Sequence, residues 1–172
     1  MIIPQLLTNF RVYGNGNNDM IGVADVELPK LENMTETVKG AGIGGEIEVP
    51  VAGHYSKMTV KLKYRTITDN AVALSSSKSQ QLEIRGAQQM YDNKAGEVKI
   101  VPVKVVLRGL PMSLEPGKFE PGKVTDTTVE ISAEYLKMTL NGKDVIEIDK
   151  YNYVAKIGDT DYLADVRSVL GL

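Results

Sequence analysis

The sequence predicts one mainly β domain with few helices. Apolar and polar side chains alternate near residues 56–67, 81–92, 97–108 and 125–139, which is the period of strands with one buried face. Turn signals rich in Gly, Asn and Asp separate several of these stretches, as in hairpins. A chain of 172 residues is large enough to bury one core. We therefore expect a single domain spanning residues 1–172.

Composition narrows the classes of function. The chain carries 20 basic and 22 acidic side chains, so it has no overall attraction to nucleic acid or anionic lipid. It has no cysteine, which excludes disulfides and thiolate metal sites. No apolar run approaches the roughly 18 residues of a membrane span, and the N-terminus lacks a basic region and a cleavage-like site. We expect a soluble protein without a membrane anchor that stays in the compartment where it is made.

The N-terminal third predicts two short strands and a long loop. Phe10–Tyr13 and Met20–Leu28 are the strands, joined by a turn rich in Gly and Asn. Residues 30–45, KLENMTETVKGAGIGG, show neither a helical nor a strand period and end in a cluster of glycines. We expect a loop over about residues 30–50 that bends sharply or passes close to other backbone.

The middle of the chain predicts a strand, a helix and a hairpin. The strand near 56–67 is followed by a short helix that begins at Asp69 as N-cap. Residues 82–91 and 97–108 form a hairpin, and Pro102 predicts a bulge because proline cannot donate to a ladder. Residues 109–124, rich in proline and glycine, predict a second loop.

The stretch 125–149 predicts the longest hairpin. Its first strand has an apolar face and a polar face. The apolar face comprises Thr127, Val129, Ile131, Ala133 and Tyr135, and the polar face comprises Thr128, Glu130, Ser132 and Glu134. Asn141-Gly142 predicts a type I′ turn, after which Val145–Ile148 returns. A further strand over 151–157 and a helix over 161–170 complete the chain.

Residues that carry chemistry are scarce. Gly40, Gly42 and Gly45 match G-x-G-x-x-G, but a strand-like run follows them instead of a helix, so a structural loop is the better interpretation. His54 is the only histidine and has no nucleophile setting beside it. Glu130 and Glu134 are about 13 Å apart along one strand, too far for a glycosidase pair. We predict no catalytic, cofactor-binding or metal-binding residue, and no enzyme.

A row of basic residues alternates along the strand near 56–67. It comprises Lys57, Lys61, Lys63 and Arg65. Such a row could follow a phosphate backbone, but no aromatic side chain is interleaved with it as a stacking platform. A solvated face, or a face matched to acidic neighbours, is the favoured interpretation.

The long amphipathic strands also imply exposed sheet edges. Unpaired edges invite association with other chains. Either the sheet closes within one chain, or identical chains complete one another in a head-to-tail ring. Composition alone leaves both possibilities open.

Several short motifs, in order along nearly the whole chain, carry a family resemblance. They are ELPKL (27–31), KGAGIGG (39–45), VVLRG (105–109), YLKMTLNGK (135–143), IEID (146–149) and the terminal Gly-Leu. With these motifs the sequence resembles the major tail tube proteins of contractile-tailed bacteriophages and the tube subunits of phage-tail-like bacteriocins.

The resemblance implies a two-sheet β-sandwich or barrel-like fold with a short helix, assembled as stacked hexameric rings. Neighbouring subunits would pool strands into an inner β-barrel whose bore carries a tape-measure protein and later DNA in a phage. Sheath, baseplate and tail terminator proteins would be further partners in a virion or bacteriocin particle assembled in the host cytoplasm. Residues of the long loop would contact adjoining subunits or rings: Lys39, Gly40, Gly42, Gly44 and Gly45.

Within that resemblance, we predict which side chains line the bore. They are polar or acidic and lie on strand faces opposite the apolar ones: Glu83, Thr128, Glu130, Ser132 and Glu134. Like charge would prevent a passing phosphate chain from docking. Two alternatives remain, a ring protein of a type VI-like secretion system and a stand-alone β-sandwich binding module or enzyme.

Overall fold

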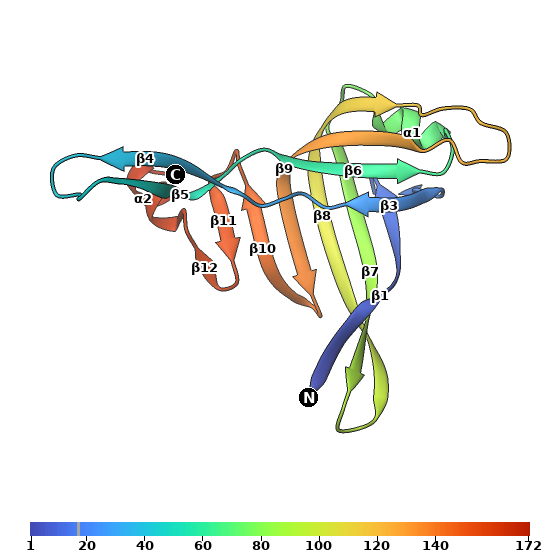
Figure 1. The fold of residues 1–172 in the computed structure, drawn as a ribbon, viewed down its shortest axis with the longest axis horizontal. Coiled ribbons are helices and arrows are strands. Elements are labelled where there is room, and N and C mark those ends of the chain that lie inside the picture. The colour runs from blue at the N-terminus through green and yellow to red at the C-terminus, as the bar shows by residue number, and fades with distance from the viewer. Residues whose placement is uncertain (17) are drawn as a thin grey trace.

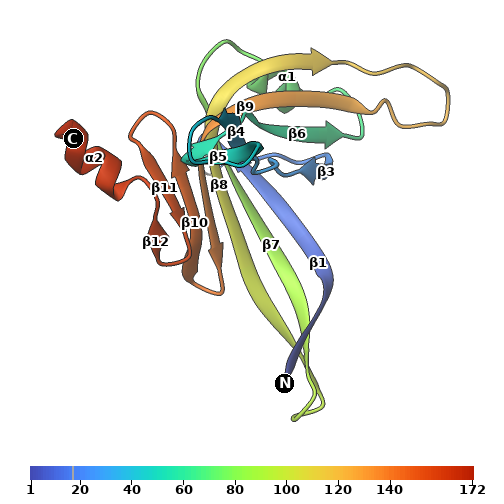
Figure 2. The ribbon, with the colours of Figure 1, turned by 60° about the vertical axis from the view of Figure 1, so that its left-hand side comes forward.

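A computed structural model describes residues 1–16 and 18–172. Within these residues the chain forms a ten-stranded sheet, a two-stranded sheet and two short helices (Figures 1 and 2). The predicted mainly β, two-sheet fold is therefore confirmed.

The large sheet is antiparallel throughout, in the order β12-β11-β10-β9-β8-β7-β1-β2, with β3 and β6 joined to it through β9. Its strands are β1 (Ile2–Gly14), β2 (Asn18–Asp19), β3 (Val23–Glu27), β6 (Met58–Tyr64), β7 (Gln80–Asp92), β8 (Glu97–Glu115), β9 (Thr127–Leu140), β10 (Lys143–Asp149), β11 (Val154–Ile157) and β12 (Thr160–Asp161). β9 is the central element because β8 pairs along one side of it, while β6 and β10 share the other.

The core lies on one face of this sheet. Its fully buried side chains come from alternate positions of β6, β7, β8 and β9, as the period of two predicts. They include Met58, Val60, Leu62, Tyr64, Leu82, Val105, Leu107, Val129 and Ile131. Each large apolar side chain buried in this way stabilises the fold by about 1.5–3 kcal/mol. Burial also raises the pKa of Tyr64 to about 12.

One side chain of β9 departs from the predicted pattern. Arg108 pairs with Tyr135 but Gly109 pairs with Ala133, so Glu134 is an extra residue in the ladder. This bulge moves the core face from Ala133 to Leu136. The prediction that Tyr135 lies on the apolar face was therefore wrong.

Both predicted hairpins are present, but Pro102 causes no bulge. Asn141 and Gly142 have φ of 48° and 78°, as a type I′ turn requires. The β7–β8 register runs unbroken through the pair Ala87–Pro102. The Pro102 carbonyl accepts from the Asn141 amide at 2.9 Å, just beyond the end of β9. At Pro102 an N–H group would face the region beyond the end of β9, where the ladder has already ended, so its loss costs no ladder hydrogen bond. The prediction of a bulge at Pro102 was therefore wrong.

Two expected loops are largely strands. Most of residues 30–50 form the hairpin of β4 (Asn33–Lys39) and β5 (Glu46–Tyr55), which projects from the body (Figure 1). β8 continues to Glu115, so the second loop covers only 116–126 instead of 109–124. Neither segment is buried along one face over much of its length, and the glycine and proline residues in both favoured a loop.

The two helices are short and differ from expectation at their starts. α1 (Asp69–Leu74) is capped by Thr68, whose hydroxyl accepts from the Ala71 amide at 3.2 Å, so Asp69 is not the cap. α2 (Ala164–Leu170) begins after the short strand β12 and ends at Gly171. The predicted strand 151–157 is shortened to β11, because residues 150–153 form a turn.

Candidate assembly surfaces

The predicted bore residues lie on one face of the large sheet. Glu130 and Ser132 alternate with buried Val129, Ile131 and Ala133, and so face away from the core. Thr128 and Glu134 follow the same alternation in β9, and Glu83 does so in β7. We call this surface, on β6, β7, β8 and β9, the charged face.

Glu130 is matched by a lysine of the basic row. Lys61 is its cross-strand partner, with Nζ 3.9 Å from the carboxylate, and Ser113 donates to Glu130 at 3.3 Å. Lys63 lies 3.9 Å from Asp25 on the next strand. For Lys61 and Lys63, the interpretation of a face matched to acidic neighbours is confirmed. Exposed pairs of this kind contribute roughly 0–1 kcal/mol each, so they set local charge more than stability.

Glu134 belongs to a network centred on Arg108. The guanidinium lies 3.3 Å from Glu134 and 3.8 Å from Asp149. It also lies over the ring of Tyr135, 5.3 Å from the centroid. The Tyr135 hydroxyl donates to Glu147 at 3.2 Å. Because of the bulge, Tyr135 lies on the charged face, where its ring contacts Arg108 and its hydroxyl contacts Glu147.

Glu83 has two cationic neighbours. Partial burial alone would raise the pKa of its carboxyl, but the hydrogen bond from Arg85 and the charges of Arg85 and Lys104 outweigh this and lower it. Lys104 lies 3.5 Å away on β8, and Arg85 also stacks on Tyr13 at 4.7 Å.

Sequence reasoning identified the acids of the charged face but missed their partners. The partners also alternate with buried residues, on β7 and β8, and this alternation could have placed them on the charged face: they are Arg85, Lys104 and Arg108. Their pairing with particular acids depends on strand register and on the bulge in β9, which the sequence pattern does not specify. The face is therefore a mosaic of paired charges instead of a purely acidic surface.

A three-stranded arm extends beyond the end of β9 (Figures 1 and 2). It comprises residues 2–9 of β1, 87–92 of β7 and 97–102 of β8. Its exposed apolar side chains are Ile2, Ile3, Leu6, Leu7, Val98 and Ile100. Consecutive residues such as Ile2 and Ile3 point to opposite faces, so the arm exposes apolar groups on both. Sequence reasoning missed residues 2–9, because a strand exposed on both faces shows no alternation.

The β4–β5 hairpin is amphipathic and exposed. Val38 pairs with Ile47 and Glu36 with Val49, so three apolar side chains share one face. The other face is polar, with Thr35 donating to Glu48 and Lys39 pairing with Glu46. A two-stranded hairpin without cover is marginally stable in water.

The predicted loop residues form the tip of this hairpin. Lys39 ends β4, Gly40, Gly42 and Gly45 have positive φ, and Gly44 lies between them. Strand β5 follows directly, so no helix N-terminus is present here to bind a dinucleotide phosphate, which agrees with the structural interpretation.

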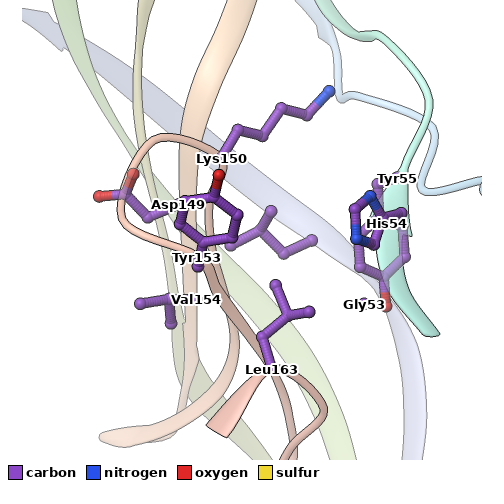
Figure 3. Close-up of a pocket in the computed structure, with 9 residues that line it drawn as sticks. Gly53, His54, Tyr55, Asp149, Lys150, Tyr153, Val154 and Leu163 are labelled. Carbon is purple, nitrogen blue, oxygen red and sulfur yellow. The ribbon is translucent and has the colours of Figure 1, made fainter. Parts of the chain in front are cut away.

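A cavity of about 140 Å³ lies where the hairpin joins the body (Figure 3). His54 and Tyr55 line it from β5, Lys150 and Tyr153 from the β10–β11 turn, and Leu163 from the segment before α2. Burial raises the pKa of Tyr55 and lowers that of Lys150. No serine, threonine or cysteine is among the residues that line this cavity beside His54.

Clustered metal-ligating side chains are absent from the part of the chain that the structure describes. There, no group of three or more His, Cys, Asp and Glu side chains could hold a metal ion. Asp159 pairs with Lys143 at 3.6 Å, and Asp161 pairs with Arg167 at 2.6 Å. No helix in the described residues is long and apolar enough to cross a membrane.

An open antiparallel sheet with an exposed edge and an exposed apolar arm is typical of β proteins that associate with other chains. A family model described as "Phage tail tube protein FII" matches residues 4–171. The chain belongs to this phage tail tube family, and it is a structural subunit of a tail tube.

Individual phage proteins and a solved structure are also similar to this chain. The chain is 26% identical over 174 residues to the tail tube protein of Escherichia phage P2, covering 100% of both chains. It is 24% identical to the major tail tube protein of Serratia phage KSP20, covering 100% of this chain and 99% of the other. Its fold is similar to a chain in the sheath/tube terminator structure of the extracellular contractile injection system PVC, with a TM-score of 0.55, 16% identity, and coverage of 79% and 96%.

Proposed function

We propose that this tail tube subunit forms hexameric rings that stack into the hollow inner tube of a contractile phage tail or tail-like bacteriocin. The tube is the conduit that penetrates the envelope of the target cell. One observation carries the proposal: within the residues that the structure describes, the outer edge of β1 lacks a partner strand over most of its length.

The β1 edge is the strongest support. On the side away from β7, β2 pairs only with Tyr13 and Gly14, and the Val12 carbonyl accepts from Met20. Residues 2–11 therefore present an unpaired ladder on that side, within the described part of the chain. Head-to-tail addition of identical subunits satisfies such an edge in every copy and closes into a ring.

The charged face lines the bore in this proposal, through Glu83, Thr128, Glu130, Ser132 and Glu134. Its acids neutralise the cations Lys61, Lys104 and Arg108, with which they are paired, so these cations are not free to bind a phosphate chain. Unpaired cations repeated six times around a ring would instead bind the phosphate chain strongly and in a salt-sensitive way. Paired charge therefore suits a hydrated bore through which a tape-measure protein, and DNA in a phage, passes.

The hairpin reaches a neighbouring subunit in the same ring or the next. Its apolar face, with Val38, Ile47 and Val49, gains the cover that it lacks in one chain. The glycines at its tip allow close approach to another backbone. Sheath, baseplate and tail terminator proteins are the further partners, in a particle assembled in the host cytoplasm.

A matched pair of substitutions tests the assembly. Leu6 on the arm is 57% exposed and Val72 on α1 is 50% exposed, so lysine at either position leaves the monomer fold intact. We expect Leu6→Lys to abolish tubes in electron micrographs of the purified protein, because a charge on the arm blocks association. Val72→Lys should form tubes like the unchanged protein.

Three results contradict the proposal. They are a monomer at all concentrations by light scattering even with a nucleating platform, single rings that never stack, and Leu6→Lys tubes equal to those of Val72→Lys.

A further inference from the structure

Strand β5 bends sharply at the base of the hairpin. Asn33 pairs with Tyr55, and the next pair is Thr35 with Pro50, so β5 carries three residues more than β4 between these pairs. Gly53 lies within this bulge with φ of 72°, a conformation that favours glycine. The bulge sets the direction in which the rest of the hairpin leaves the body.

The side chain of Leu163 fills the bend. A Cβ atom at Gly53 would lie 2.5 Å from Cγ and 2.6 Å from Cδ2 of Leu163, so only glycine fits at this distance. Leu163 is itself buried, and Figure 3 places it between the β5 strand and the β10–β11 turn. The body therefore holds the bend through close packing.

Two hydrogen bonds reinforce the same joint. Lys150 donates from Nζ to the Ser56 carbonyl at 2.7 Å, and the Ser56 amide donates to the Glu32 carbonyl at 2.8 Å. Lys150 is fixed in turn by its amide, which donates to the Glu134 carbonyl of β9 at 3.1 Å. Beyond this joint, every residue of β4 and residues 46–52 of β5 are exposed.

We propose that Gly53 and Leu163 form a fixed elbow that positions the β4–β5 hairpin, so that its apolar face meets a second copy of this chain without a search over orientations. The inference rests on the proposed role of the hairpin in subunit contacts. A hairpin held in its bound direction before assembly loses less freedom on binding, which favours association.

Gly53→Ala tests the elbow, with Gly44→Ala as its control. Alanine at Gly53 introduces the clash with Leu163 and a strained positive φ, which together shift the local opening equilibrium by about tenfold or more. A Cβ at Gly44, at the tip of the same hairpin, meets no atom within 4 Å and needs no positive φ. Hydrogen exchange of residues 33–55 in the dilute subunit and the rate of tube growth are measured for both variants.

We expect Gly53→Ala to raise hydrogen exchange across the hairpin about tenfold and to slow tube growth, while exchange in β7, β8 and β9 stays unchanged. Gly44→Ala should match the unchanged protein in both measurements. Leu163→Ala combined with Gly53→Ala removes the clash, so tube growth should recover in part.

Two outcomes overturn the elbow. If Gly53→Ala and Gly44→Ala give equal exchange, the contact does not hold the hairpin. If exchange rises but tubes grow at the normal rate, the hairpin is held but its direction does not matter for assembly. Failure of the unchanged protein to form tubes contradicts the proposed function instead, and the exchange data still decide whether the elbow exists.

Discussion

Gly109 shows how a single residue fixes the central strand pair. It lies beside the bulge in β9, where a Cβ atom would be 2.0 Å from the Ser132 carbonyl oxygen. The obstacle is backbone, so no side-chain rotation relieves it. We expect Gly109→Ala to lower the free energy of unfolding by about 1–3 kcal/mol or more, measured by urea denaturation.

Gly44→Ala is the matched control for that substitution and should stay within about 0.5 kcal/mol of the unchanged protein. Equal urea midpoints for the two variants would contradict the close approach of β8 and β9.

Asp161 and Arg167 give a stability contribution that depends on pH. The hydrogen bond from Arg167 at 2.6 Å holds the pKa of Asp161 below its usual value of about 3.9. The pKa of Asp161 is lower in the folded state than in the unfolded state. Its ion pair with Arg167 therefore contributes fully to stability above about pH 4, and this contribution is lost as the pH falls through the folded pKa. Arg167→Met should cost about 1–2 kcal/mol at neutral pH, by urea denaturation.

At about pH 2 the difference between Arg167→Met and the unchanged protein should shrink. The hydrogen bond from Arg167 to the Tyr153 carbonyl does not depend on the charge of Asp161 and should still distinguish them. A difference that is the same at both pH values would show that the Asp161 carboxylate contributes nothing.

At the scale of elements, the start of α1 separates two capping hypotheses. The Thr68 hydroxyl accepts from the Ala71 amide, whereas Asp69 lies in the first turn. We expect Thr68→Ala to cost about 0.5–2 kcal/mol in thermal or urea unfolding. Asp69→Ala should cost less, because it removes only a charge near the helix N-terminus, about 0.3–1 kcal/mol. The reverse order would support Asp69 as the cap.

The elements that sequence reasoning predicted well are those with one buried face. β6 and the first half of β9 alternate between buried and exposed side chains, so their period could be read directly. Residues 2–9 of β1 are exposed on both faces and gave no such signal, while in the β4–β5 hairpin Glu36 interrupts the apolar face and the glycine-rich tip favoured a loop. Their strand conformation comes from pairing with distant strands, which local sequence does not encode.

The bulge at Glu134 shows the same limit within a correctly predicted strand. Alternation predicts that Tyr135 is buried, but one extra residue moves Leu136 to the core instead. The candidate site was predictable to a similar extent. The acids of the charged face followed from alternation, while Arg108 as partner of both Glu134 and Asp149 depended on register.

At the scale of the whole molecule, paired charge predicts how a tube treats DNA. Glu130→Lys places a second cation opposite Lys61 and removes the acid that matches it. Repeated around each ring, these lysines should make tubes retain DNA, with retention falling as salt concentration rises. Retention is measured by co-sedimentation of tubes with short duplexes at low and high salt.

Tubes of the unchanged protein are the reference for this prediction, and they should retain little DNA at either salt concentration. Equal retention by Glu130→Lys tubes would indicate that Glu130 lies away from the bore.

The central claim is that identical copies complete the unfinished edge of β1 to form a hollow cylinder. A cryo-electron microscopy map of tubes grown from the purified protein tests it most directly. We predict sixfold rings in which residues 2–11 of each β1 form ladder hydrogen bonds with another copy, and in which Glu83, Glu130 and Glu134 face the bore. A map in which β1 stays unpaired, or in which these three acids face the outside of the tube, would contradict it.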